Sequence, residues 1–245
     1  ERKAVFGIPS YVDHMVKNGW LGSKSNQGFY KKDKSSGKSE ILVLDLNTLE
    51  YRPQTKVKFA TLEAAKQVDD LKARTKLLFN GKDKAGEFYR KSFLGVFAYV
   101  SNRIPEIADD LYKIDDAMRA GFGWELGPFE TWDAIGIDNT INLFQDMGLT
   151  LAAWIRDMKN KGINAFYKTE DGVRYFYDVA SGNYRAIPGQ ENKISIANLP
   201  ESSILWKNSG TTIHDLGNGI LNLSFHTKMN TIGGEVLAGL NKAID

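Results

Sequence analysis

Apolar residues recur at helical spacing through the middle of the chain. They follow one face from residue 61 to residue 80 and predict a single long helix, which Asn80–Gly81 would end as a left-handed cap. The segment 86–101 is aromatic or aliphatic at most positions and predicts a largely buried central helix. Beyond Pro105, a further helix is predicted by the stripe Ile107, Leu111, Ile114 and Met118. The middle of the chain is therefore expected to be helical.

A short helix is marked between Gly127 and Gly136. Gly127 can serve as a conformationally permissive N-cap, and Pro128 has a φ already suited to the first helical position. Glu130 adds negative charge to the first turn, and Gly136 can end the helix. One buried face is predicted for Phe129, Trp132 and Ile135. Such a helix suits many all-α folds, so its pattern predicts a scaffold and no activity.

Two segments with strand-like alternation repeat each other. Leu42–Arg52 aligns without gaps to Tyr175–Arg185, and each predicts a β-hairpin around a polar turn. Upstream, Met15–Gly19 recurs loosely as Met158–Gly162, and Phe29–Lys31 recurs as Phe166–Lys168, in the same order. We interpret this as a duplicated helical domain in which each copy ends in a small hairpin.

The last part of the chain has a third pattern. Residues 211–216 and 220–225 flank Gly217–Asn218–Gly219, which predicts a hairpin, and a helical stripe follows from Ile232 to Ile244. A strand that leads into a helix is half of a βαβ unit. The tail is expected to open another domain, and a C-terminal helix docked on the body is the alternative.

Composition excludes several classes of protein. The 245 residues carry 32 basic and 30 acidic side chains, a net charge of +2, so no basic field for nucleic acid is present. No apolar run could cross a bilayer, and no signal-type segment follows Glu1–Arg2–Lys3, so we expect no membrane partner and a cytoplasmic location. Without cysteine, and with three isolated histidines, a structural metal is not expected. A solvated helix face is expected for Asp109, Asp110, Asp115 and Asp116.

Three segments resemble known families. Ile114–Gly136 (IDDAMRAGFGWELGPFETWDAIG) resembles the central motif of the helical domain of 3-hydroxyacyl-CoA dehydrogenases, and Pro9–Lys32 resembles the C-terminal end of that domain. Phe225–Asp245 resembles the first strand and helix of enoyl-CoA hydratases, the crotonase fold. Glu125 departs from the motif, where the family often has Pro. The order of the three segments is similar to that in fused dehydrogenase and hydratase proteins of fatty-acid β-oxidation that place the hydratase last.

The resemblance implies a mainly α fold with appended hairpins and four regions. Residues 1–55 would end a first helical domain, 56–170 would form the second, 171–202 a hairpin and linker, and 203–245 the start of a crotonase domain. It further implies NAD and a CoA thioester in the parent enzyme, acyl-CoA as substrate, and Rossmann and crotonase domains as partners. A homodimer is left open. An inert helical interaction or oligomerisation module derived from the same scaffold is the alternative function.

The family's catalytic and cofactor groups have no match here. No G-x-G-x-x-G follows a strand; Gly121–Phe122–Gly123 comes nearest but follows an amphipathic helix. The family's His–Glu pair has no counterpart at His14, His214 or His226. An independent Ser–His–Asp hydrolase lacks a Gly-x-Ser-x-Gly elbow. We therefore assign no catalytic, cofactor-binding or metal-binding residue to this chain.

Arg90 bears on the second helical copy. Counting back from Ile114, Gly86–Lys91 aligns with the family's Gly-Phe-Ile-x-Asn-Arg segment, and Arg90 stands where its substrate-contacting Asn would be. An arginine cannot accept a hydrogen bond, so it cannot replace an amide that both donates and accepts. Asn102 lies twelve residues too late and is interpreted as a helix end. The sequence predicts a catalytically degenerate copy and an isolated chain without activity.

Overall fold

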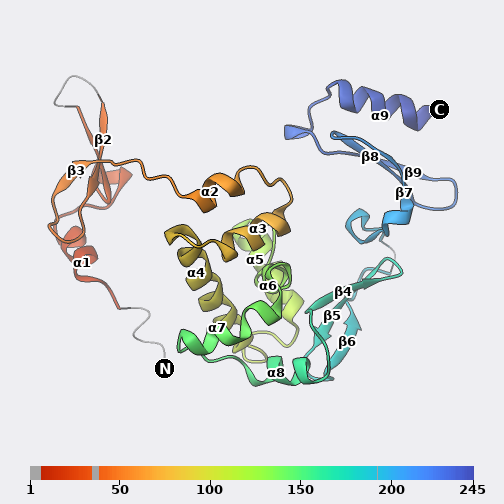
Figure 1. Cartoon of the computed structure of the whole chain (residues 1–245), viewed down its shortest axis with the longest axis horizontal. Helices are drawn as coiled ribbons and strands as arrows, with labels where there is room; N and C mark the ends of the chain where they lie inside the picture. Colours follow the sequence, from red (N-terminus) through yellow and green to blue (C-terminus); the bar gives the residue numbers. More distant parts are fainter. Residues whose placement is uncertain (1–6, 35–38, 192) are drawn as a thin grey trace. The chain divides into compact units, whose positions relative to one another are not determined.

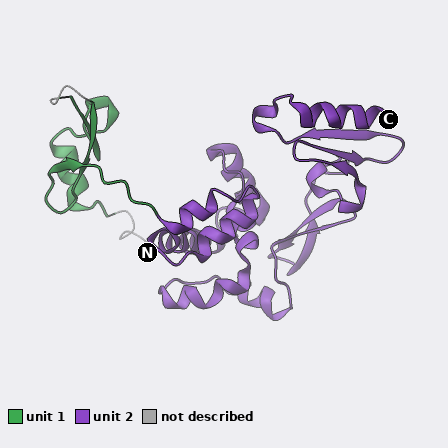
Figure 2. Ribbon diagram, turned by 45° about the horizontal axis from the view of Figure 1, so that its top comes forward, with its two compact units in different colours: residues 1–58 green, residues 59–245 purple. Residues whose placement is uncertain are grey.

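The chain separates into two compact units in a computed structural model. It describes residues 7–34, 39–191 and 193–245, so the N-terminal Glu1, Arg2 and Lys3 lie outside the described residues. Unit 1 is Glu1–Lys58 and unit 2 is Phe59–Asp245, coloured separately in Figure 2. Each unit has its own small antiparallel sheet or sheets, and helices are the commonest regular structure in the described part of unit 2 (Figure 1).

Unit 1 is one helix with a three-stranded sheet. Helix α1 (Ser10–Lys17) precedes β1 (Tyr30–Asp33), β2 (Glu40–Leu44) and β3 (Tyr51–Pro53), which pair in the order β1-β2-β3. The hairpin expected over 42–52 is the β2–β3 pair, in which Val43 lies opposite Arg52. Among the described residues of this unit, Met15 of α1 and Leu44 of β2 are the buried apolar side chains.

The body of unit 2 consists of short and medium helices. They are α2 (Ala60–Ala65), α3 (Leu71–Asn80), α4 (Lys84–Ser101), α5 (Leu111–Phe122), α6 (Pro128–Ile135) and α7 (Ile141–Asp146). The single helix expected over 61–80 is wrong, because Asp70 begins α3 by accepting a hydrogen bond from Ala73 N at 2.7 Å. Gly81 is no left-handed cap either: its φ is −52°, and a Cβ there would lie 2.4 Å from Thr61 Oγ1.

The core of the body is aromatic and centred on α6. The face predicted for Phe129, Trp132 and Ile135 is fully buried. The Trp132 ring stacks on Phe97 of α4 with centroids 4.7 Å apart, and its indole N–H donates to Thr140 Oγ1 at 2.7 Å. Gly136 ends α6 with φ 93°, as the sequence predicts.

Helix α8 (Ala153–Asn160) and a second three-stranded sheet follow the body. The strands β4 (Tyr167–Glu170), β5 (Val173–Asp178) and β6 (Asn183–Ala186) pair in chain order, and this sheet crosses the boundary expected at residue 170. The expected hairpin over 175–185 is the β5–β6 pair, with Tyr177 opposite Tyr184.

The two helix-and-sheet segments repeat the same local structure. The Tyr51 hydroxyl donates to Gly28 O at 2.5 Å, and the aligned Tyr184 hydroxyl donates to Ala165 O at 2.6 Å. Register also agrees, because Tyr30 of β1 pairs with Val43 as Tyr167 of β4 pairs with Phe176.

The turns of the two segments agree as well. Gly19 after α1 and Gly162 after α8 have φ of 69° and 77°. In the hairpins, Leu49 has φ 60° and the aligned Gly182 has φ 66°, so both turns need a left-handed residue at the same place. The sequence repeat therefore corresponds to a repeat of hydrogen bonds and backbone conformation.

The C-terminal segment is a sheet with a helix on it. Strands β7 (Ile204–Lys207), β8 (Thr211–Asp215) and β9 (Leu221–Phe225) are antiparallel, and α9 (Gly234–Ile244) packs on β8 and β9. The close approach requires Gly239, where a Cβ would lie 2.3 Å from Thr211 Oγ1. In the described part of the chain, no helix combines the length and apolar character that crossing a membrane requires.

Candidate functional site

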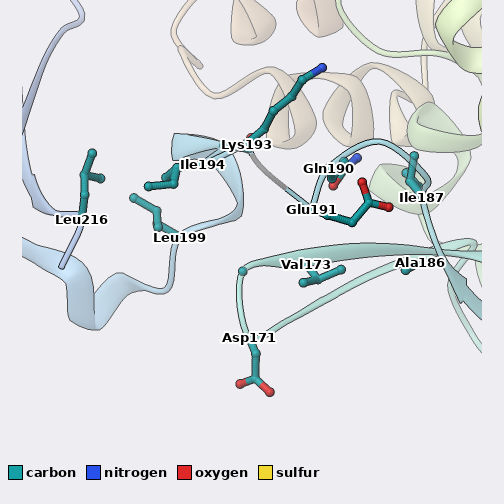
Figure 3. Close-up of a pocket in the computed structure, with 12 residues that line it drawn as sticks. Asp171, Val173, Ala186, Ile187, Gln190, Glu191, Lys193, Ile194, Leu199 and Leu216 are labelled. Carbon is teal, nitrogen blue, oxygen red and sulfur yellow. The ribbon is translucent and has the colours of Figure 1, made fainter. Parts of the chain in front are cut away.

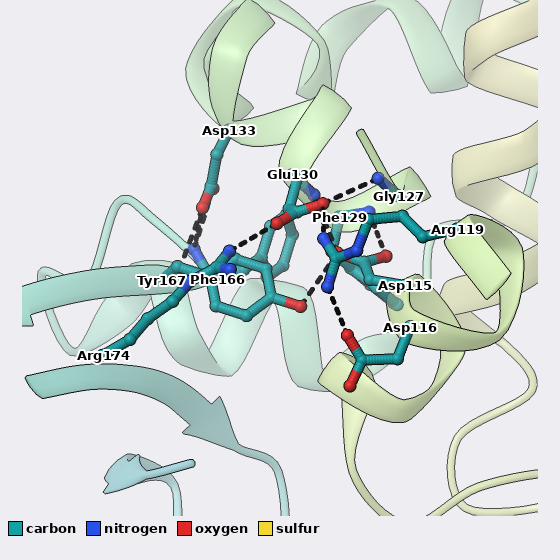
Figure 4. Close-up of polar contacts among 10 residues, drawn as sticks. All are labelled: Asp115, Asp116, Arg119, Gly127, Phe129, Glu130, Asp133, Phe166, Tyr167 and Arg174. Atoms are coloured by element: carbon teal, nitrogen blue, oxygen red, sulfur yellow. Dashed lines mark hydrogen bonds and ion pairs between the residues drawn. The ribbon is translucent and has the colours of Figure 1, made fainter. Parts of the chain in front are cut away.

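Buried carboxylates gather around the N-terminus of α6 (Figure 4). Asp115 of α5 is fully buried and accepts hydrogen bonds from Phe129 N at 2.9 Å, Glu130 N at 3.0 Å and the Tyr167 hydroxyl at 2.8 Å. Its carboxyl group lies beside N–H groups that the helix itself leaves unpaired. Asp115 thus joins α5, α6 and β4 through one side chain.

Gly127 allows this close approach. A Cβ on Gly127 would lie 2.3 Å from Asp115 Cβ, and its φ of −71° is ordinary for any residue. The glycine is required for space between α5 and α6, whereas the sequence pattern suggested only a permissive cap.

Glu130 is the second carboxylate of the cluster. It accepts from Gly127 N at 2.7 Å, which is half of a capping box, and forms ion pairs with Arg119 and with Arg174, the latter at 2.6 Å. Burial raises the pKa of Glu130, but the Gly127 N–H and the two guanidinium groups outweigh it and leave the pKa below its usual value. Glu130 is therefore held ionised.

Asp133 is the third carboxylate and holds the sheet to the body. Its oxygens accept from Phe166 N at 2.8 and 3.0 Å and from Tyr167 N at 2.9 Å. Burial raises the pKa of Asp133 to about 7, and burial does the same for Asp115. The pKa values of Asp115 and Asp133 are raised, whereas that of Glu130 is lowered. Two arginines form ion pairs with Glu130, and among the described residues no ion pair with Asp115 or Asp133 is found.

The expectation of a solvated acidic face is wrong for two of the four aspartates. Asp115 is 0% exposed and Asp110 is 7% exposed, and Asp110 forms ion pairs with Lys113 and Arg185. The position of Asp115 along the helix could have indicated its burial. It follows Leu111 by four residues, so it lies on the same, buried face of α5. No group of three or more metal-ligating side chains occurs among the residues that the structure describes.

A pocket of about 410 Å³ opens beside Glu130 and Asp133. Basic side chains from three elements, Lys72, Lys168 and Arg174, line it with them. A carboxyl with a pKa near 7 could exchange protons in such a pocket. Every oxygen of Asp115 and Asp133, however, already accepts a hydrogen bond from the protein, so the arrangement serves to hold β4 against α6.

These pKa shifts predict how stability depends on pH. Between pH of about 4 and 7 the folded chain retains protons on Asp115 and Asp133 that the unfolded chain has released, so the free energy of unfolding falls as pH rises through that range. We expect a loss of about 2–3 kcal/mol for each of the two carboxyls from pH 5 to pH 8, because each folded pKa lies about two units above pH 5 and one pKa unit is worth about 1.4 kcal/mol. Urea denaturation at both pH values measures it.

The matched variants are Asp133→Asn, which should reduce this dependence by about half because Asp115 still contributes, and Asp116→Asn, which should keep it because Asp116 is exposed. If the free energy of unfolding depends on pH equally in Asp133→Asn and in the unsubstituted chain, Asp133 does not have the raised pKa assigned to it.

A second pocket, of about 310 Å³, lies between the β5–β6 hairpin and the segment that follows it (Figure 3). Val173, Ile187 and Leu199 contribute apolar surface to it, and its charged side chains Asp171, Glu191 and Lys193 are exposed. Exposed charged side chains stay hydrated, so the pocket buries none of these three groups.

The three histidines lie in separate surroundings. His14 packs edge-on against Trp20 at 5.4 Å, and exposed His226 contacts Thr212 Oγ1 through Nε2 at 2.8 Å. His214 is buried, with Nδ1 3.1 Å from Ser203 Oγ, but that hydroxyl donates to Pro200 O at 2.7 Å. Since a serine has one proton to donate, this pair is no nucleophile with its base.

Arg90 has a structural role in the helical body of unit 2. Its Nη1 donates to Phe79 O at 2.8 Å and to Gly81 O, which closes the corner between α3 and α4. Asn102 is the C-cap residue of α4, and its amide donates to Thr150 O at 2.8 Å. The Arg90 guanidinium and the Asn102 amide nitrogen are thus both engaged by backbone carbonyls.

Comparison with known proteins identifies the segment that contains this cluster. Residues 106–168 match the family described as 3-hydroxyacyl-CoA dehydrogenase, C-terminal domain. The match runs from before α5 into β4 and includes Asp115, Glu130, Asp133 and Tyr167. No solved structure matched the chain.

Curated relatives match the chain over nearly all of its length. A probable 3-hydroxyacyl-CoA dehydrogenase from Bacillus subtilis (strain 168) is 41% identical over 100% of this chain. A putative fatty acid oxidation complex trifunctional enzyme from Rickettsia prowazekii (strain Madrid E) is 27% identical over 95% of it. The chain spans only 30% and 28% of these two relatives. The resemblance to 3-hydroxyacyl-CoA dehydrogenases is thus confirmed, and residues 106–168 are similar to the C-terminal domain of that family.

Proposed function

We propose that this chain supplies the helical part of an NAD-dependent 3-hydroxyacyl-CoA dehydrogenase of fatty-acid oxidation. The observation that carries the proposal is the match of the α5–α8 region to the family's C-terminal domain, within a chain 41% identical throughout to a probable dehydrogenase. In this proposal the helices pack on a Rossmann domain and shape the acyl-CoA cleft. Hydride transfer takes place outside residues 1–245.

The described residues do not fit a dinucleotide. Binding its pyrophosphate needs a glycine-rich turn between a strand and a helix. Gly121 and Gly123 lie instead at the end of α5, where Gly123 is the C-cap with φ 67°. No catalytic or cofactor-binding role is therefore proposed for any residue of this chain.

The remaining parts of the proposal concern domains. Residues 1–55 end a first helical domain, 56–170 form a second and degenerate one, 171–202 are hairpin and linker, and 203–245 open a crotonase domain. The repeated hydrogen bonds of Tyr51 and Tyr184 support the duplication, and the use of Arg90 to bind backbone carbonyls supports the degeneracy.

An assay of the purified chain tests the proposal. We expect no oxidation of NADH by acetoacetyl-CoA and no saturable NAD binding by calorimetry. Turnover or NAD binding by the 245 residues alone would overturn the placement of the chemistry elsewhere.

The alternative is an inert interaction module, which the exposed aromatic side chains Phe122 and Trp124 favour. Sedimentation equilibrium together with CoA titration separates the two functions. Weak CoA binding by a monomer supports the dehydrogenase part, and tight self-association without CoA binding supports the module.

A further inference from the structure

The two repeated segments differ in what covers them. In unit 2, Phe166 is 0% exposed, whereas the aligned Phe29 of unit 1 is 46% exposed and its neighbour Tyr30 is 57% exposed. The inner residues do not differ in this way, because Met15 and Leu44 are buried like their counterparts Met158 and Tyr177. One face of unit 1 is therefore uncovered while its interior is complete.

The side chains of the uncovered face already have the arrangement of the covered one. Tyr11 and Phe29 meet edge to face with centroids 6.3 Å apart, and the aligned Trp154 and Phe166 meet edge to face at 5.9 Å. Lys31 lies over the Tyr51 ring at 5.6 Å, as Lys168 lies over Tyr184 at 5.1 Å. Unit 1 thus presents a preformed surface and needs no rearrangement to be covered.

Helix α6 covers this face in the second segment. Phe129 and Trp132 each place a ring 5.0 Å from that of Phe166. Asp133 accepts from the backbone N–H groups of Phe166 and Tyr167 (Figure 4). Among the described residues, no side chain accepts from the N–H groups of Phe29 or Tyr30.

We propose that a second helix of the α6 type docks on the face formed by Tyr11, Phe29 and Tyr30. The helix presents aromatic side chains to Phe29 and an aspartate carboxylate to the N–H groups of Phe29 and Tyr30. Two backbone donors on one carboxylate form charge-assisted hydrogen bonds, and removal of Phe29 from water adds apolar stabilisation. This inference rests on the proposed function, since it needs a longer polypeptide.

The occupant comes from a helical segment upstream of residue 1 in the longer protein. In the second copy the body, residues 59–152, comes before the segment that it covers, and the same order places the other body upstream. The relatives are long enough, because the chain spans only 30% of the Bacillus subtilis protein. A second copy of this chain is disfavoured, since its Asp133 is already occupied by its own Phe166 and Tyr167.

Amide hydrogen exchange on two proteins tests the inference. In the 245-residue chain, we expect the amides of Phe166 and Tyr167 to exchange at least about 100-fold more slowly than those of Phe29 and Tyr30. In the protein expressed with its natural upstream sequence, the amides of Phe29 and Tyr30 should acquire protection of the same order.

Phe29→Ala in the longer protein should reduce that new protection by at least about 10-fold. The matched control is Leu21→Ala, an exposed residue in a loop without counterpart in the second copy, which should change it by less than about 2-fold. Unchanged exchange at Phe29 and Tyr30 in the longer protein would overturn the inference, as would a coding sequence without an upstream helical segment.

Protection that appears in the 245-residue chain at high concentration would also overturn it, in favour of a second copy as the occupant. The proposed function fails separately, if the longer protein shows the new protection but does not reduce acetoacetyl-CoA with NADH.

Discussion

Asp115→Ala lowers the free energy of unfolding by about 3–5 kcal/mol, which is the largest effect that we expect from a polar substitution in this chain. The alanine leaves three buried donors, Phe129 N, Glu130 N and the Tyr167 hydroxyl, without their acceptor. Each such group costs about 1–3 kcal/mol when it is neither hydrated nor bonded. Urea denaturation followed by circular dichroism measures the loss.

The matched control is Asp116→Ala, one residue further along α5. Its side chain is 56% exposed and pairs with Arg119, so its removal should change the free energy of unfolding by less than about 1 kcal/mol. Equal losses in the two variants would show that Asp115 does not hold α5, α6 and β4 together.

Trp132→Ala is expected to cost about 3–5 kcal/mol through a different mechanism. The indole is fully buried, stacks on Phe97 and lies 5.4 Å from Phe144 and 5.0 Å from Phe166, so its loss leaves a cavity at the centre of the body. The hydroxyl of Thr140 loses the indole N–H as well. Thermal unfolding monitored by near-ultraviolet circular dichroism reports the change.

Trp124→Ala is the matched control, because it removes a side chain of the same size from a less buried place. Trp124 is 37% exposed in the loop before α6. It should lower the free energy of unfolding by less than about 1 kcal/mol. If Trp124→Ala is as costly as Trp132→Ala, the loop rather than α6 organises the core.

Local signals in the sequence predict much of the fold. Gly136 needs a positive φ to end α6, and the 3.6-residue period places Phe129, Trp132 and Ile135 on one face, so both features could be predicted from the chain alone. The prediction failed over 61–80, where the apolar stripe continues across Asp70 although its carboxylate begins a new helix. Periodicity cannot distinguish a side chain that caps a helix from one that faces solvent.

The acidic cluster was harder to predict, because its contacts join residues far apart in the sequence. Tyr167 and Asp115 are separated by 52 positions, and Phe166 and Asp133 by 33. Charge alone suggested that Asp115 is exposed, whereas its place on the helical face of Leu111 indicated burial. Helical position is the better guide where an aspartate can reach the N-terminus of another helix.

The guanidinium of Arg90 would make the proposed degeneracy of the second copy hard to reverse. A single Arg90→Asn change would place an amide at the position where the family resemblance expects one. The asparagine side chain is shorter than that of arginine, so Phe79 O and Gly81 O would lose their hydrogen bonds at the corner between α3 and α4. The mutated corner would lose both bonds before any substrate contact was regained. Under the proposed degeneracy, a return to the family's amide therefore has to rebuild this corner first, because the intermediate with asparagine at position 90 is less stable.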